Sequence, residues 1–187
     1  MTDSRADKHP LVVDAYELKR QPGSSLRRTV VVPVEDAMGN DVLKAKPNTQ
    51  AEIELLLESV IDGILATGNA EFETEGLCVR CLDGIDRPEN VTFRQFFTYP
   101  GVAVEEAEEE SEDIVEITGN FLDLRPAFRD AVLLALPLTP TCRSDCPGLC
   151  PECGQRLADE PDHGHEKQDP RWSALSGWQP DHQPEGE

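Results

Sequence analysis

Four cysteines in one short stretch of the sequence could bind a metal ion. Cys142, Cys146, Cys150 and Cys153 are separated by three, three and two residues. Thiolates spaced this closely can converge on one tetrahedral Zn²⁺, with Zn–S bonds of about 2.3 Å. Gly154 follows the last thiol and permits the left-handed backbone that such a tight turn usually needs. The spacing therefore predicts a zinc module within residues 141–157.

A second pair of thiols, Cys78 and Cys81, lies far upstream in the sequence. Six thiols exceed the four positions around one zinc ion, so two arrangements are open. In the compact arrangement the last four cysteines bind the ion, and Cys78 and Cys81 are free or redox-paired. In the split arrangement Cys78 and Cys81 join two of the downstream four and link distant parts of the chain. Disulfides are the alternative to a metal, and a reducing compartment disfavours them.

Few residues in the sequence are suited to catalysis. The chain has no Gly-rich phosphate loop, no G-x-S-x-G and no H-E-x-x-H. All four histidines, at positions 9, 163, 165 and 182, fall in the predicted tails. We interpret His163 and His165 beside the cysteine cluster as incidental, and Trp172 and Trp178 as candidate anchors for a partner. We therefore expect a protein that is not an enzyme.

The charge of the chain indicates which partners it could bind. Its 37 acidic and 17 basic residues give a net charge of −20, which disfavours nucleic acid as a direct ligand. An acidic surface suits a basic protein partner instead. The densest acidic run lies between residues 105 and 116. The candidate partner-binding residues in this run are Glu105, Glu106, Glu108, Glu109 and Glu110.

Hydrophobic patterning predicts an α+β fold. Strands are expected at residues 26–34, 51–59, 61–67, 70–77, 91–97 and 114–118, with turns at 62–63 and 68–69 and a loop at 83–90. Within 51–59 apolar and acidic residues alternate, which is typical of a sheet covered on one side only. A helix is expected at 120–136, with Asp123 as its N-cap and Pro126 in its first turn. We thus predict an antiparallel β-sheet meander covered by one helix, followed by the zinc module.

Composition suggests how the chain is divided. Residues 1–10 are polar and are predicted to be disordered, residues 11–157 to form one domain, and residues 158–187 to form a disordered acidic tail. The sequence has no run of eighteen apolar residues and no recognisable signal peptide. We therefore expect a cytoplasmic protein that does not span a membrane.

Three segments together resemble a known protein family. They are Cys78-Val-Arg-Cys-Leu82, Asp123-Leu-Arg-Pro-Ala-Phe-Arg-Asp-Ala-Val-Leu-Leu-Ala-Leu-Pro137 and Cys142-Arg-Ser-Asp-Cys-Pro-Gly-Leu-Cys-Pro-Glu-Cys-Gly154. In this order they resemble the bacterial YceD family, the large ribosomal RNA subunit accumulation proteins. The resemblance implies a role in accumulating 23S ribosomal RNA and in large-subunit assembly, and it implies no known catalytic activity. The acidic tail departs from the family pattern.

Three hypotheses about function follow. The first is a non-enzymatic assembly factor that binds a large-subunit ribosomal protein or a pre-ribosomal particle. The second is a zinc protein that binds RNA directly, using basic residues that include Arg27, Arg28, Arg80 and Arg143. The third is a thiol-redox or metal-transfer protein that uses Cys78 and Cys81. The identity of the four metal ligands, the choice between Zn²⁺ and Fe²⁺, and the oligomeric state stay open.

Overall fold

The chain folds into two compact units, Met1–Cys146 and Pro147–Glu187. A computed structural model describes residues 9–18, 20–34, 38–102, 115–165 and 171. Within these residues no helix is long and apolar enough to cross a membrane.

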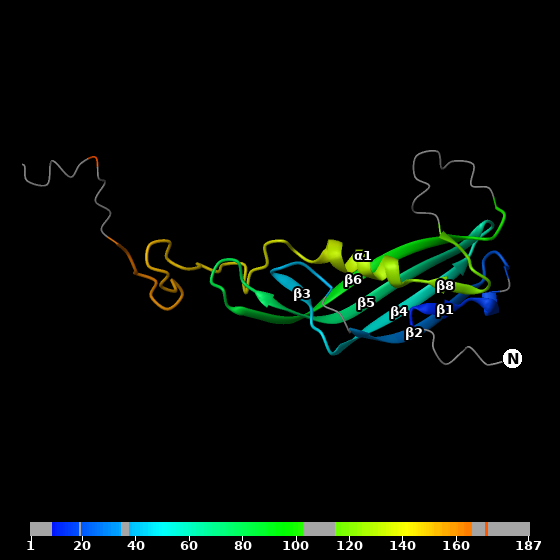
Figure 1. Ribbon diagram of the computed structural model, residues 1–187, viewed down its shortest axis with the longest axis horizontal. Helices are drawn as coiled ribbons and strands as arrows, with labels where there is room; N and C mark the ends of the chain where they lie inside the picture. The colour runs from blue at the N-terminus through cyan, green and yellow to red at the C-terminus, as the bar shows by residue number, and fades with distance from the viewer. Residues whose placement is uncertain (1–8, 19, 35–37, 103–114, 166–170, 172–187) are drawn as a thin grey trace, which may run out of the picture. The chain divides into compact units, whose positions relative to one another are not determined.

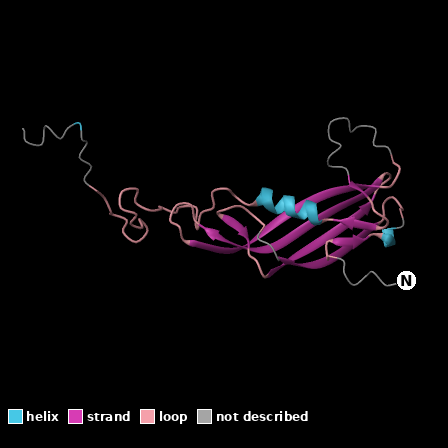
Figure 2. Ribbon diagram, viewed as in Figure 1, coloured by secondary structure: helices cyan, strands magenta, loops and turns pink. Residues whose placement is uncertain are grey.

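The first unit is built on a large, mostly antiparallel sheet (Figures 1 and 2). Its strands are β2 (Ser25–Val34), β3 (Leu43–Ala45), β4 (Thr49–Ser59), β5 (Gly63–Leu77), β6 (Gly84–Thr98) and β7 (Val115–Glu116). The strand order is β2-β4-β5-β6-β7, and β3 pairs with β5; among the strands that the structure describes, the β6–β7 pair alone is parallel. A second sheet pairs β1 (Val12–Asp14) with β8 (Phe121–Asp123), and the short 3₁₀ helix η1 (Tyr16–Leu18) follows β1.

One helix, α1 (Arg125–Ala135), covers one face of the large sheet along β6 (Figure 1). Its buried Phe128 packs against Phe72 of β5 and Phe93 of β6, with ring centroids 6.5 Å and 6.0 Å apart. On β4, Ile53 and its apolar neighbours are buried toward this side, while the alternate residues, such as Glu54, are exposed. The structure thus confirms an antiparallel-rich sheet covered by one helix.

The predicted turn at residues 68–69 is wrong, because β5 runs through it without a break. Gly68 is opposite Phe93 in the neighbouring strand, and a Cβ at Gly68 would lie 2.2 Å from the phenyl Cζ. Glycine inside a strand often marks such a close approach and need not mark a turn.

The predicted loop at residues 83–90 is also wrong, because β6 begins at Gly84. Pro88 pairs with Glu73 inside this strand. Proline is tolerated in edge strands, and among the described residues β6 pairs on its other side only at Phe97 and Thr98. As a result β5 and β6 form one long hairpin, which ends in the turn that carries Cys78 and Cys81.

The helix is shorter than predicted. Residues 121–123 form β8, and the helix begins at Arg125 with Leu124 as its N-cap, without a side-chain capping bond. Asp123 is therefore not the cap. Its carboxylate instead accepts hydrogen bonds from the backbone N–H and the guanidinium of Arg125. Pro126 lies in the first turn, as predicted.

The described part of the second unit, residues 147–165 and 171, consists mainly of turns, with one β-bridge between Leu149 and Arg156. Most of the predicted disordered segments fall outside the described residues, as do Trp172 and Trp178. The predicted domain boundaries and disordered tails therefore stay predictions.

Candidate metal centres

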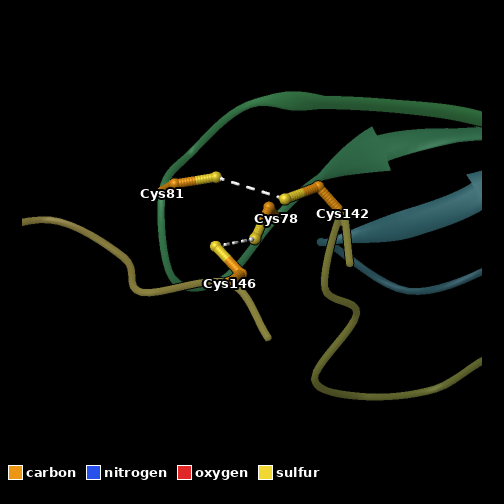
Figure 3. Close-up of side chains that lie close together, drawn as sticks. All are labelled: Cys78, Cys81, Cys142 and Cys146. Carbon is orange, nitrogen blue, oxygen red and sulfur yellow. Dashed lines mark hydrogen bonds between the residues drawn. The ribbon is translucent and has the colours of Figure 1, made fainter. Parts of the chain in front are cut away.

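The first candidate metal centre joins two segments that are far apart in the sequence. Cys78 and Cys81 lie in the β5–β6 turn, and Cys142 and Cys146 lie in the loop after α1 (Figure 3). Two hydrogen bonds hold this loop against the turn. The Val79 N–H donates to the Pro140 carbonyl, and the Arg80 guanidinium donates to the Cys146 carbonyl, both at 3.0 Å.

The four sulfurs have the spacing of a tetrahedral thiolate site. The Sγ atoms of Cys78 and Cys146 lie 3.8 Å apart, and those of Cys81 and Cys142 lie 3.6 Å apart. Four sulfurs bound to one zinc at about 2.3 Å would be separated by about 3.8 Å, the edge of the tetrahedron. A disulfide would need an S–S distance of about 2.05 Å, and all four thiols are free. The geometry fits a metal ion and does not fit disulfides.

Electrostatics at this centre also favours a cation. Burial raises the pKa of the Cys78 thiol, but backbone N–H groups of Cys142, Cys81 and Arg80 outweigh it and lower that pKa to about 6. Burial and the neighbouring thiols of Cys78, Cys146 and Cys142 raise the pKa of Cys81. Without a cation, one thiolate therefore forms readily while its neighbour resists ionisation. A bound divalent ion would remove this conflict by stabilising all four thiolates.

The second candidate metal centre lies in the second unit and contains Cys150, Cys153, His163 and His165. The Cys150 N–H donates to the Gln155 carbonyl at 2.7 Å, and the Gly154 N–H donates to the Cys150 carbonyl at 2.9 Å. Gly154 has φ +74°, the left-handed conformation predicted for it. Backbone N–H groups of Cys153 and Glu152 stabilise the Cys150 thiolate and lower its pKa to about 6.

The structure divides the downstream cysteines between the two centres. The compact set of Cys142, Cys146, Cys150 and Cys153 is not brought together. The thiols that meet are those of one split arrangement, because the continuous β5–β6 hairpin carries Cys78 and Cys81 to the loop after α1. His163 and His165, which we interpreted as incidental, lie beside Cys153. The available signal was the H-x-H pair shortly after a C-x-x-C pair.

The predicted RNA-binding arginines lie on three segments of the fold, which are β2, the β5–β6 turn and the loop after α1. Arg27 and Arg28 are consecutive in β2, so their side chains lie on opposite faces of the sheet. Arg28 pairs with Glu17 at 3.4 Å and Arg143 with Asp145 at 3.2 Å, while Arg80 is bound to the Cys146 carbonyl. The predicted acidic partner-binding residues, which lie between positions 105 and 110, fall outside the described residues.

A different acidic surface is described, on the side of the large sheet that α1 leaves open. We call it the acidic face. It contains Glu52, Glu54 and Glu58 of β4 and Glu71 and Glu73 of β5, and the exposed Arg27 of β2 and Arg94 of β6 lie on the same face. Glu52 is directly opposite Glu71, an arrangement of like charges that destabilises a sheet. Glu52, Glu54 and Glu71 have no ion pair with any residue that the structure describes.

Comparison with known proteins decides the family. Residues 66–177 match the family described as large ribosomal RNA subunit accumulation protein YceD. The chain belongs to the YceD family. The YceD match contains both candidate metal centres, α1, β6 and β5 from residue 66 onward. The YceD description names a role in accumulation and no reaction.

Mycobacterial relatives extend the similarity over most of the chain. An uncharacterized protein of Mycobacterium tuberculosis is 38% identical over 174 residues, which are 93% of this chain and 84% of the relative. An uncharacterized protein of Mycobacterium leprae is 36% identical over 167 residues, which are 89% of this chain and 76% of the relative. No solved structure matches this YceD protein.

Proposed function

We propose that this chain is a non-enzymatic, cytoplasmic factor in large ribosomal subunit biogenesis. It supports the accumulation of 23S ribosomal RNA by binding a basic large-subunit ribosomal protein, free or within a pre-ribosomal particle. The description of the YceD family supports the ribosomal role, and the choice of a protein partner rests on the chain's own surface.

The acidic face carries the proposal of a basic protein partner. Glu52 and Glu71 face each other across β4 and β5, and Glu54 lies beside them. Such a concentration of unpaired carboxylates weakens the free sheet and is relieved when lysines or arginines of a partner approach. The net charge of −20 adds long-range attraction for a basic protein and repulsion for bare RNA.

Zinc is the metal that best fits the thiols of the first centre. Cys78, Cys81, Cys142 and Cys146 would supply four thiolates, the ligand set of closed structural zinc sites. A closed site leaves no position for substrate, so the ion would tie the β5–β6 turn to the loop after α1 and would catalyse nothing. This role agrees with a protein that acts by binding.

The proposal is tested by the balance of ribosomal RNA in the protein's own host. Deleting the gene should lower the ratio of 23S to 16S RNA, and the wild-type chain should restore it. The acidic-face variant E52Q/E54Q/E71Q should restore it poorly, because its partner contact is weakened. The control D41N/D62N/D130N removes the same number of charges from exposed positions elsewhere and should restore it fully. An unchanged ratio after deletion would refute the ribosomal role.

A further inference from the structure

The residues of the second unit converge on one point through local backbone turns. Cys150 and Cys153 lie in the tight turn closed by Gly154, and the bridge between Leu149 and Arg156 completes a short hairpin. The chain then turns again, because the His163 N–H donates to the Glu160 carbonyl at 3.0 Å. This second turn returns His163 and His165 to the thiols.

The ligand atoms form a compact group that hydrogen bonds alone explain poorly. Cys153 Sγ lies 3.2 Å from Nε2 of His163 and 3.2 Å from Nε2 of His165, and the two nitrogens are 3.0 Å apart. Two imidazole nitrogens and a thiol in a closed triangle cannot each direct a proton at the others with good geometry. They can all direct lone pairs at one cation. Zinc binds nitrogen at about 2.0–2.1 Å and sulfur at about 2.3 Å, so the distances between ligand atoms in a tetrahedral site are only slightly larger than those observed here.

Each imidazole has a carboxylate near its other nitrogen, on the side where zinc-bound histidines usually have one. Nδ1 of His163 lies 3.4 Å from a carboxylate oxygen of Glu160, and Nδ1 of His165 lies 3.7 Å from one of Glu152. A histidine that binds metal through one nitrogen commonly donates its other N–H to a carboxylate, which orients the ring. The two rings are nearly perpendicular, at 85°, and their Nε2 atoms lie 3.0 Å apart.

We propose that Cys150, Cys153, His163 and His165 form a second, structural zinc site of the Cys₂His₂ type. The chain then binds two Zn²⁺ ions, one in each compact unit, because Cys78, Cys81, Cys142 and Cys146 already complete the first tetrahedron. Few apolar side chains are buried in the second unit, so its ion takes the place of a hydrophobic core. This inference does not depend on the ribosomal role.

The first test is the zinc content of the purified full-length protein. Wild type should contain two zinc ions per chain, and H163A/H165A and C78S/C81S should each contain one. The control H9A removes a described histidine that belongs to neither centre and should keep two ions. One ion in wild type, or two in H163A/H165A, would overturn the proposal.

The second test needs no variant, so it holds even if a variant fails to fold. X-ray absorption at the zinc edge reports the average ligand set over both ions. A Cys₄ site and a Cys₂His₂ site together average to three sulfur ligands and one nitrogen ligand per zinc. A signal from sulfur alone would contradict the participation of His163 and His165.

Discussion

Gly68 shows how a single residue controls the packing of this sheet. The phenyl ring of Phe93 lies over it, in the space that any side chain at position 68 would occupy. From the sequence, Gly68-Asn69 has the composition of a turn, because glycine permits both a turn and a close approach. Only the neighbouring strand decides between them, and a local pattern does not reveal which residue of that strand lies opposite.

Gly68→Ala should destabilise the protein by about 1–3 kcal/mol, because the new methyl group displaces the Phe93 ring from a packed core. Urea unfolding measures the change. Gly84→Ala is the matched control, since a Cβ at Gly84 meets nothing within 4 Å. Equal stability of the two variants would show that the ring does not occupy this space.

The ion pair between Asp123 and Arg125 leads to a second prediction, which concerns stability at different pH values. The guanidinium of Arg125 holds the pKa of the Asp123 carboxyl below its usual range. The stabilisation is thus fully present above the unfolded pKa of about 3.9 and is lost as the pH falls through the lower folded pKa. Because the pair is partly exposed, Asp123→Asn should cost less than about 1 kcal/mol at pH 7.

The difference between wild type and Asp123→Asn should shrink as the pH is lowered from 7 to 3, because acid protonates the wild-type carboxyl. Urea unfolding across this range measures it. Asp130→Asn, on the exposed side of α1, controls for the loss of one negative charge. A difference that grows with acid would contradict the Asp123–Arg125 pairing.

At the scale of elements, the alternation of apolar and polar residues predicted strand burial correctly, but the start of the helix was predicted wrongly. The alternation in β4 correctly indicated one buried and one acidic face, because strand burial depends on the side to which each residue points. The start of α1 was misplaced, since apolar spacing around residues 121–124 fits β8 as well as a helix. Pairing with β1, far away in the sequence, decides for the strand.

The candidate site was predicted only in part for a related reason. Cysteine spacing indicates that thiols bind metal, but it does not say which distant thiols meet. That choice depends on the length of the β5–β6 hairpin. Gly68 and Pro88 led to the prediction of a turn and a loop there, and so of separate short strands. His163 and His165 were discounted because a polar, acidic segment gives no local sign that it turns back.

The docking of α1 yields a prediction at this scale. Phe128→Ala should destabilise the protein by about 3–5 kcal/mol, because the buried ring contacts both Phe72 and Phe93. Leu134→Ala in the same helix should change stability by about 0.5 kcal/mol or less, since Leu134 is 87% exposed. Thermal unfolding compares them. A small loss for Phe128→Ala would mean that α1 contributes little to the core.

At the scale of the whole molecule, metal removal should destabilise the cysteine-containing segments and leave the sheet folded. Chelation should increase amide hydrogen exchange in residues 78–83 and 138–165, because few buried apolar contacts hold these segments without an ion. The central residues of β4 and β5 should stay protected by their backbone ladder and core. Adding Zn²⁺ back should restore protection and adding Mg²⁺ should not. Equal exchange with and without metal would contradict a structural role.

The central claim is that this protein binds a basic large-subunit protein through its acidic face. The most direct measurement is the recovery of large-subunit proteins with the tagged full-length chain, purified from its own host with and without ribonuclease. We predict that recovery persists after ribonuclease, falls several-fold for E52Q/E54Q/E71Q and is unchanged for D41N/D62N/D130N. Recovery that disappears with ribonuclease would point to RNA as the direct ligand and would contradict the claim, as would equal recovery with all three proteins.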